Sequence, residues 1–230
     1  MCGRLNVTDS PALGALCEQL EISLWHGAPI YKRFIRATDQ VSLVRQHHGI
    51  RRMDNAIWWL LLEPTASGFS PSRYTSFNTR YDKLNVPGSA GYKAFRQSRC
   101  VIPVSGFGET EFAGKKPLHY HDLYAEDGAM LLGGLYREWH HPASGNTLMS
   151  CSVITLPPHP KLADVHTKAM PLILPKQPAL ISHWLDESQQ DVTQFTPLLA
   201  PNLPQTLIAQ PIDKPSLHQC AGEAFVIDAD

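Results

Sequence analysis

The chain has 230 residues, of which 43% are hydrophobic and 18% charged, an ordinary globular composition. No apolar run is long enough to cross a membrane, and no basic stretch followed by an apolar one opens the chain, so we expect neither a membrane span nor a secretory signal. The five cysteines are widely spaced and form no C-x-x-C pair, which argues against a disulfide framework or a cysteine zinc site and favours a cytoplasmic protein.

Charge is distributed unevenly along the chain. The net charge is −1, yet residues 31–100 hold twelve Lys or Arg against four Asp or Glu, whereas residues 101–230 hold seven against fourteen. A basic segment inside a nearly neutral protein is typical of a local polyanion site, although a solvated basic face has the same composition.

The first predicted element is an amphipathic helix of about three turns. Ser10 followed by Pro11 is a typical helix start, with a capping side chain and a proline in the first turn. Apolar residues then recur at helical spacing: Leu13, Leu16, Cys17 and Leu20.

The next stretch is predicted from shorter patterns. Residues 28–39 show no periodicity and are expected to be irregular, while residues 41–44 alternate like a strand. Residues 56–62 form a short apolar run between turn residues, which indicates a buried strand with Trp58 and Trp59 on opposite faces.

The second half is predicted to be mostly strand. Residues 92–97 favour one or two helical turns, and residues 178–185 favour a further helix. Strands bounded by turns are expected at 99–104, 117–124, 129–136 and 148–156. The even spacing of the last three favours an antiparallel meander. These patterns predict an α+β fold in a single domain, residues 1–230.

The opening Met1-Cys2-Gly3-Arg4 offers unusual chemistry. If Met1 is removed, Cys2 carries a thiol and a free α-amine, with pKa values near 8.5 and 8. Such an aminothiol condenses with an aldehyde to an imine, and the thiol then closes a thiazolidine ring. A cysteine in second position also occurs by chance, so other residues have to support this interpretation.

Two residues are candidates for proton transfer. Glu109 follows an apolar strand, and partial burial there would raise its pKa toward that of a general acid. His166 lies before the apolar run 170–174 and could transfer protons near neutral pH. A solvent-exposed loop glutamate and a structural histidine are the simpler alternatives.

Asn78 and Arg80 are candidates for binding a sugar or phosphate. Their i, i+2 spacing places both on one face of an extended chain. A loop cap is the commoner role of asparagine. The sequence has no phosphate loop, dinucleotide fingerprint or metal-ligand spacing, so we expect no cofactor and no metal.

Four motifs in order resemble the SOS-response-associated peptidase family, whose members process abasic sites and crosslink to DNA. The motifs are Met-Cys-Gly-Arg at the start, Asn78-x-Arg80, the segment 99–109 ending in Gly106-Phe107-x-Glu109, and His166 with Met170-Pro171-Leu172-Ile173-Leu174. The resemblance implies a curved, mostly antiparallel, open barrel-like sheet with flanking helices and a basic cleft for single-stranded DNA.

The resemblance also implies roles. Cys2 would form a thiazolidine with the ring-opened sugar of an abasic site, after removal of Met1 by the protein's own peptidase-like activity. Asn78 would fix the N-terminus and the sugar, Glu109 would position or protonate the opened sugar, and His166 would transfer protons, including in reversal of the link. The residues expected to contact DNA are Arg4, Arg33, Arg36, Trp58 and Arg80. The implied partners are single-stranded DNA containing abasic sites and the replication machinery, with no membrane and no metal.

The chain departs from the family pattern around its glutamate. An aromatic residue and a tryptophan usually flank it, whereas Gly108 and Thr110 do so here. Because stacking on a base is worth roughly 1–3 kcal/mol, we expect intact crosslinking chemistry with altered DNA affinity or structure preference. Two other functions remain open: an N-terminal-nucleophile peptidase or amidase, and a DNA-binding domain that holds lesions without reacting.

Overall fold

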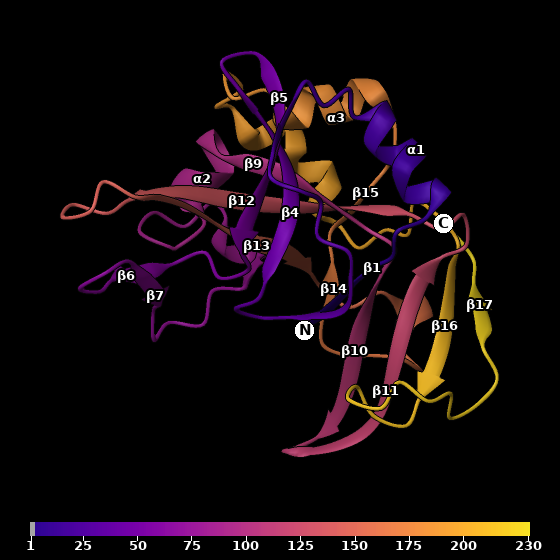
Figure 1. Ribbon diagram of the computed structural model, residues 1–230. Helices are drawn as coiled ribbons and strands as arrows, with labels where there is room; N and C mark the ends of the chain where they lie inside the picture. Colours follow the sequence, from indigo (N-terminus) through magenta and orange to yellow (C-terminus); the bar gives the residue numbers. More distant parts are fainter. Residues whose placement is uncertain (1–2) are drawn as a thin grey trace.

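Two curved sheets form the body of the computed structural model, which describes residues 3–230, and helices cover one end (Figure 1). The helices are α1 (Pro11–Gln19), α2 (Tyr92–Gln97) and α3 (Pro178–Leu185), with short 3₁₀ turns η1 (Tyr81–Lys83), η2 (Pro160–Leu162) and η3 (Val192–Leu199). The strands of the first half are β1 (Arg4–Val7), β2 (Leu24–His26), β3 (Lys32–Arg36), β4 (Gln40–His47), β5 (Ile50–Ile57), β6 (Leu62–Pro64), β7 (Phe69–Pro71) and β8 (Asn78–Arg80). Those of the second half are β9 (Arg99–Val104), β10 (Gly106–Ala113), β11 (Lys116–Ala125), β12 (Met130–His140), β13 (Thr147–Leu156), β14 (Met170–Pro171), β15 (Ile173–Leu174), β16 (Leu207–Ile212) and β17 (Phe225–Ile227).

The larger sheet closes on itself. Strands β13, β12, β9, β4 and β5 are neighbours in that order, and a short parallel pairing of β5 with β13 joins Ala56 to Met149 and completes a five-stranded barrel. Strand β8 adds to β13 in parallel, with Asn78 opposite Val153. The predicted curved, mostly antiparallel, barrel-like α+β fold is confirmed, except that the barrel is closed by the pairing of β5 with β13 and not open.

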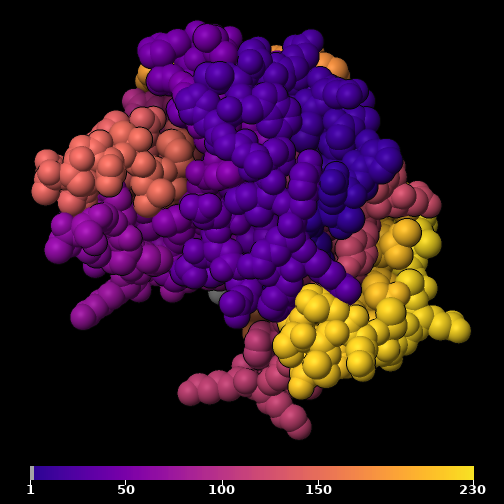
Figure 2. All heavy atoms as spheres, in the orientation of Figure 1, coloured from indigo at the N-terminus to yellow at the C-terminus, as the bar shows by residue number. Residues whose placement is uncertain are grey.

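The second sheet lies beside the barrel and carries the strands that matter most for the site. Its order is β17-β16-β11-β10-β1-β3, and its pairings are antiparallel. Strand β10 lies between β1 and β11, so Arg4 is opposite Gly108, which in turn is opposite Asp122. The β10–β11 hairpin ends in a tip that projects from the body (Figure 2). Buried residues of both sheets form one hydrophobic cluster, including Leu5 and Phe107 of this sheet.

Several predicted elements have the expected bounds. Helix α1 begins after Ser10, whose side chain accepts a hydrogen bond from Leu13 N, and it buries Leu13 and Leu16. Helices α2 and α3 and strand β9 lie where the sequence places them. These elements are local, since capping and periodicity within one segment determine them. Within the described residues, no helix is long and apolar enough to span a membrane.

Three predictions about strands were wrong, each at a place where pairing with another segment determines the structure. The run 56–62 is not one strand, because β5 ends at Ile57 and Trp58 N instead bonds Asp39 O. The expected meander breaks after β11, since β11 pairs with β10 and β16, and of the strands predicted for the meander only β12 and β13 pair with each other. The supposedly irregular 28–39 contains β3, which pairs with β1.

Candidate active site

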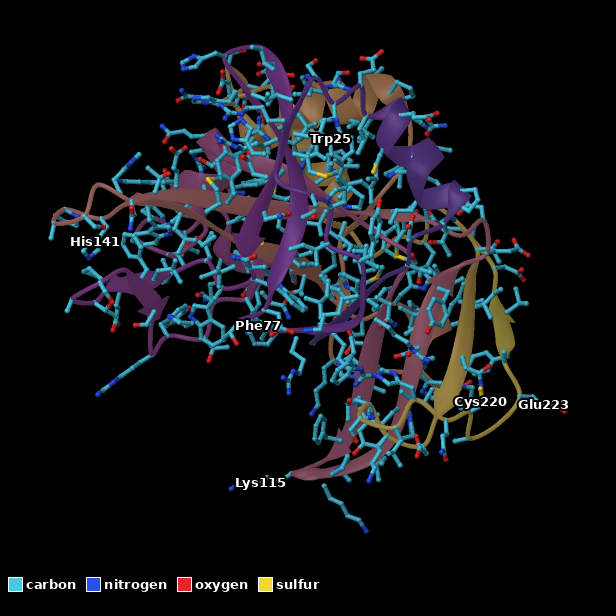
Figure 3. The ribbon with its side chains drawn as sticks, in the orientation of Figure 1. Trp25, Phe77, Lys115, His141, Cys220 and Glu223 are labelled. Atoms are coloured by element: carbon cyan, nitrogen blue, oxygen red, sulfur yellow. The ribbon has the colours of Figure 1, made fainter. Side chains whose placement is uncertain are left out.

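A hollow of about 320 Å³ opens where the two sheets meet, and it collects side chains from distant parts of the chain. Phe77, which precedes β8, lies at this junction (Figure 3). The other residues around the hollow come from β1, β10 and the segment before β14: Gly3, Arg4, Gly108, Thr110, Phe112, His166 and Lys168.

Glu109 and His166, both predicted proton-transfer residues, lie together, and His166 lines this hollow. Glu109 Oε2 lies 3.7 Å from His166 Nε2, and each residue is only 2% exposed. Burial raises the pKa of Glu109 to about 7, although the charge of Arg4 opposes the shift. Burial also lowers the pKa of His166 to about 4. At neutral pH the pair therefore consists of a carboxyl near its titration midpoint and a neutral imidazole.

The local sequence explains how both side chains reach the interior. Side chains alternate along β10, so Glu109 lies on the same face as buried Phe107, opposite Gly108 and Thr110. His166 follows η2 in a tight turn, where its backbone N–H bonds Leu162 O at 2.8 Å. A carboxyl and an imidazole 3.7 Å apart can exchange a proton through one water or after a small approach, and His166 can pass it to a group in the hollow.

Glu111 is a second carboxylate that the sequence interpretation missed. It accepts hydrogen bonds from Thr167 N at 3.0 Å and from Thr167 Oγ1 at 2.8 Å, and its Oε2 lies 3.0 Å from His166 Nδ1. Burial raises the pKa of Glu111, but the bonds from Thr167 and the charges of His166 and Lys168 together outweigh it, and the pKa is below its ordinary value. The i, i+2 spacing of Glu109 and Glu111 in a strand was the available signal.

Arg4, predicted to contact phosphate, lines the hollow, and most of its guanidinium is bound within the protein. It is 6% exposed, and its guanidinium donates to Thr110 Oγ1 at 2.9 Å and to the carbonyl oxygens of Glu109 and His121 at 3.1 Å. It also lies 3.5 Å from the buried carboxylate of Asp122. A Cβ at position 108 would collide with this guanidinium, so Gly108 and Thr110 are the residues that let Arg4 cross β10.

Asn78 and Arg80 line a neighbouring hollow of about 280 Å³, which shares Phe77 with the first. Strand β8 turns Thr79 inward, where its hydroxyl bonds Ser152 at 2.7 Å, and so Asn78 and Arg80 share the other face, as predicted. Arg80 is exposed and donates two hydrogen bonds to Asp82, each 2.9 Å long. A cation at the mouth of a hollow can attract a phosphate group.

The remaining DNA-contact predictions have different outcomes in the fold. Trp58 is completely buried, and its indole donates to Phe77 O at 2.7 Å, which contradicts a DNA-contacting role. Arg36 is exposed on β3, and Arg33 is half-exposed with its guanidinium 3.4 Å from Asp122. The basic segment 31–100 also exposes fewer cations than its composition suggests. Arg45 and Arg99 are buried, the first against Asp54 and the second on carbonyl oxygens including that of Trp184.

Cys2, the predicted nucleophile, lies outside the described residues, which begin at Gly3. The other four cysteines are free. Cys100 and Cys151 are fully buried, and burial raises the pKa of both thiols, so neither is suited to nucleophilic attack.

Comparison with family models identifies one family. A family model described as SOS response associated peptidase (SRAP) matches residues 1–215. Abasic site processing proteins YoqW and YobE of Bacillus subtilis (strain 168) are each 29% identical over 150 residues, which is 62% of this chain. The matched segment spans 62% of YoqW and 63% of YobE.

Solved structures share the fold. A protein from Bordetella bronchiseptica superposes with a TM-score of 0.69 at 16% identity, covering 93% of this chain and 100% of that one. A protein from Bacteroides thetaiotaomicron gives a TM-score of 0.69 at 18% identity, with 93% of both chains covered. At these identities the likeness concerns the arrangement of strands and helices.

Proposed function

Because this chain belongs to the SOS response associated peptidase family, we propose that it processes abasic sites in single-stranded DNA by forming a covalent link through Cys2. The names of YoqW and YobE, abasic site processing proteins, support the choice of substrate. The link requires removal of Met1, which exposes the α-amine of Cys2 next to its thiol.

The reaction follows from the chemistry of the two partners. An abasic sugar in its ring-opened form presents an aldehyde. The amine of Cys2 adds to this carbonyl carbon, the resulting carbinolamine loses water to give an imine, and the thiol adds to the same carbon. The product is a thiazolidine, and one molecule of water is released.

Buried Glu109 is the proposed acid. With its pKa raised to about 7, it is substantially protonated near neutral pH and can donate to the departing hydroxyl of the carbinolamine. His166, 3.7 Å away, takes part in proton transfer during ring closure and reversal. Asn78 fixes the N-terminus and the sugar, while Arg80, Arg33 and Arg36 attract the phosphates. Arg4 holds the strands together in this proposal, and Trp58 has no DNA contact.

The observation that carries the proposal is the position of Gly3. This residue is adjacent to Cys2 in sequence, and it lines the same hollow as His166, with buried Glu109 beside that histidine. The hollow lined by the residue after Cys2 therefore also contains a neutral imidazole next to a buried acid with raised pKa, which supports the proposal. Lys168 adds a cation to the same hollow.

The test is a denaturing gel. Protein whose intact mass proves loss of Met1 is incubated with a single-stranded oligonucleotide carrying one abasic site. We expect a shifted covalent band, which should be missing with a tetrahydrofuran analogue that has no aldehyde. Cys2→Ala should lose the stable band, although its amine can still form an imine that borohydride traps. A wild-type protein without any shifted band would refute the crosslink and leave non-covalent lesion binding.

We propose further that the protein removes Met1 itself, which is the peptidase-like part of its activity. The word peptidase in the family description supports this step. Protein made while methionine aminopeptidase is inhibited should still lose Met1, and Glu109→Gln should retain it. Retention of Met1 by the wild type under inhibition would assign the removal to the housekeeping enzyme.

The setting of this activity is also a proposal. We expect residues 1–230 to act as one domain, which the single hydrophobic cluster drawn from both sheets supports. A cytoplasmic protein of this kind would meet abasic sites in single strands exposed at the replication machinery.

A further inference from the structure

We propose that Glu111, held by Thr167, is a positioning residue that fixes the tautomer of His166 and stabilises the imidazolium formed during ring closure. The inference rests on the proposed function, because it assigns a role within the same crosslinking reaction. Neither the family resemblance nor the sequence interpretation singles out Glu111.

The first support is the contact geometry. Glu111 Oε2 lies 3.0 Å from Nδ1 of the imidazole, and Glu109 Oε2 lies 3.7 Å from Nε2, so each ring nitrogen faces a different carboxyl group. An ionised carboxylate beside Nδ1 favours the tautomer with hydrogen on that nitrogen. Nε2 then presents its lone pair toward Glu109.

The second support is the way in which Glu111 is held. The backbone N–H and the hydroxyl of Thr167 bind its two carboxylate oxygens at 3.0 and 2.8 Å. Thr167 directly follows His166, so the same turn that places the imidazole also aims the carboxylate at it. Donors on both oxygens favour the ionised form, which the lowered pKa of Glu111 reflects.

The third support is the space around the ring. His166 lines the first hollow on one side and, on the other, a hollow of about 250 Å³ formed with Pro158, His159, Pro160, Ala163 and Thr167. A polar partner on a ring nitrogen therefore adds to packing in fixing the orientation of the imidazole. Lys168, whose charge lowers the pKa of His166, lines the first hollow as well.

The proposed step balances in protons. Glu109 gives its proton to the departing hydroxyl and becomes a carboxylate. Loss of water leaves the imine protonated on nitrogen, and this proton becomes the N–H of the thiazolidine. When the thiol adds to the carbon of the protonated imine, its S–H bond breaks and Nε2 of His166 accepts the proton. The imidazolium, paired with Glu111 through Nδ1–H, then returns that proton to Glu109, which restores both groups. Glu111 stays ionised throughout, as does the aspartate of a serine-protease triad.

The test combines a spectroscopic readout with kinetics on the full chain lacking Met1. Nitrogen-15 NMR of labelled histidines, with the His166 signals identified by their loss in His166→Gln, reports the tautomer directly. We expect hydrogen on Nδ1 in the wild type and on Nε2, or on a mixture of both, in Glu111→Gln. The crosslinking rate at saturating abasic oligonucleotide should fall about tenfold to a hundredfold in this variant, a share of what general acid–base catalysis contributes. The half-saturating oligonucleotide concentration should stay the same.

Two further variants keep the test decisive. Thr167→Val removes one donor and should slow crosslinking about threefold, a fraction of the acid–base contribution. Glu63→Gln, at an exposed strand position in β6, should behave like the wild type in both readouts. Hydrogen on Nε2 in the wild type, an unchanged tautomer in Glu111→Gln, or a wild-type rate in either site variant would overturn the proposal. If the wild type forms no crosslink at all, the proposed function fails, while the tautomer measurement still decides whether Glu111 positions His166.

Discussion

Strand β10 has titratable groups with shifted pKa values on one side and a hydrogen-bonded cation on the other. On the inner side, Glu109 and Glu111 flank His166, and the pKa values of Glu109 and His166 depart far from their ordinary ones. On the outer side, the guanidinium of Arg4 is satisfied by Thr110, carbonyl oxygens and Asp122. Burial of the inner groups shifts their pKa values, and shifted pKa values are useful in catalysis. The outer cation instead links three strands through its hydrogen bonds. Removing a residue should therefore affect chemistry on one side and stability on the other.

The largest effect is expected on the outer side, from Arg4→Met. The substitution leaves Asp122, 1% exposed, with Arg33 as its remaining cationic neighbour. Losing one partner of a buried ion pair costs about 3–5 kcal/mol of unfolding free energy, and Arg33 should keep the loss near the lower limit. Urea unfolding measures it. Lys32→Met, which breaks the surface pair with Asp39, is the control and should cost less than about 1 kcal/mol. An unchanged stability together with weaker DNA binding would make Arg4 a DNA contact after all.

On the inner side, Glu109→Gln should slow crosslinking about a hundredfold or more, since a positioned general acid contributes roughly 10²–10⁴-fold. Single-turnover gels measure the rate, and fluorescence anisotropy should show unchanged affinity for the oligonucleotide. A variant that crosslinks at the wild-type rate would exclude Glu109 as the acid.

Glu109→Gln should slow the reaction but raise the stability of the folded protein relative to the wild type as pH rises. The pKa of Glu109 is about 7 in the folded protein against an ordinary 4.5, so the stability it contributes is full below about pH 4.5 and is lost as pH rises through 7. Thermal melts should show Glu109→Gln gaining on the wild type between pH 5 and 8, by roughly 3 kcal/mol at most, because one pKa unit is about 1.4 kcal/mol. His166, with its pKa lowered to about 4, acts in the opposite direction and lowers stability as pH falls below 6.5. A pH-independent difference would contradict the buried, protonated carboxyl.

Gly108→Ala tests whether Arg4 needs the space that glycine leaves on β10. A methyl group there would meet the guanidinium of Arg4, and overpacking of this kind costs about 1–3 kcal/mol. Gly14→Ala on the open face of α1 is the control, where a methyl group meets nothing within 4 Å and should stabilise by up to about 1 kcal/mol. Equal stabilities for the two variants would show that Arg4 can leave Gly108 without loss.

The smallest effect belongs to the exposed cation of the neighbouring hollow. Arg80 lines that hollow. Arg80→Gln should weaken DNA binding a few-fold and lower the slope of log K against log salt by about 1, since it removes one proposed phosphate contact. Lys176→Gln, which breaks an ion pair with Asp127 elsewhere on the surface, should leave the slope unchanged. Equal slopes for Arg80→Gln and the wild type would show that Arg80 contacts no phosphate of the bound DNA.

Local signals predicted much of the fold and part of the site. Ser10 with Pro11 marked the start of α1, and the pattern of 99–104 matched β9, because capping and alternation act within a few residues. Glu109 and His166 were found as polar residues in otherwise apolar surroundings. Glu111 was missed because its partner Thr167 is 56 residues away in sequence.

The amino-acid sequence is enough to identify the groups that can take part in the chemistry: an aminothiol after loss of Met1, one glutamate and one histidine in apolar settings, and the Asn78-x-Arg80 pair. Their contacts and pKa values depend on the tertiary structure. Pairing of β1 with β10 brought the guanidinium of Arg4 against Thr110 and Asp122, and burial at the junction of two sheets shifted the pKa values of Glu109 and His166. Strand partners and desolvation depend on segments far apart in the chain, so no pattern within one segment records them.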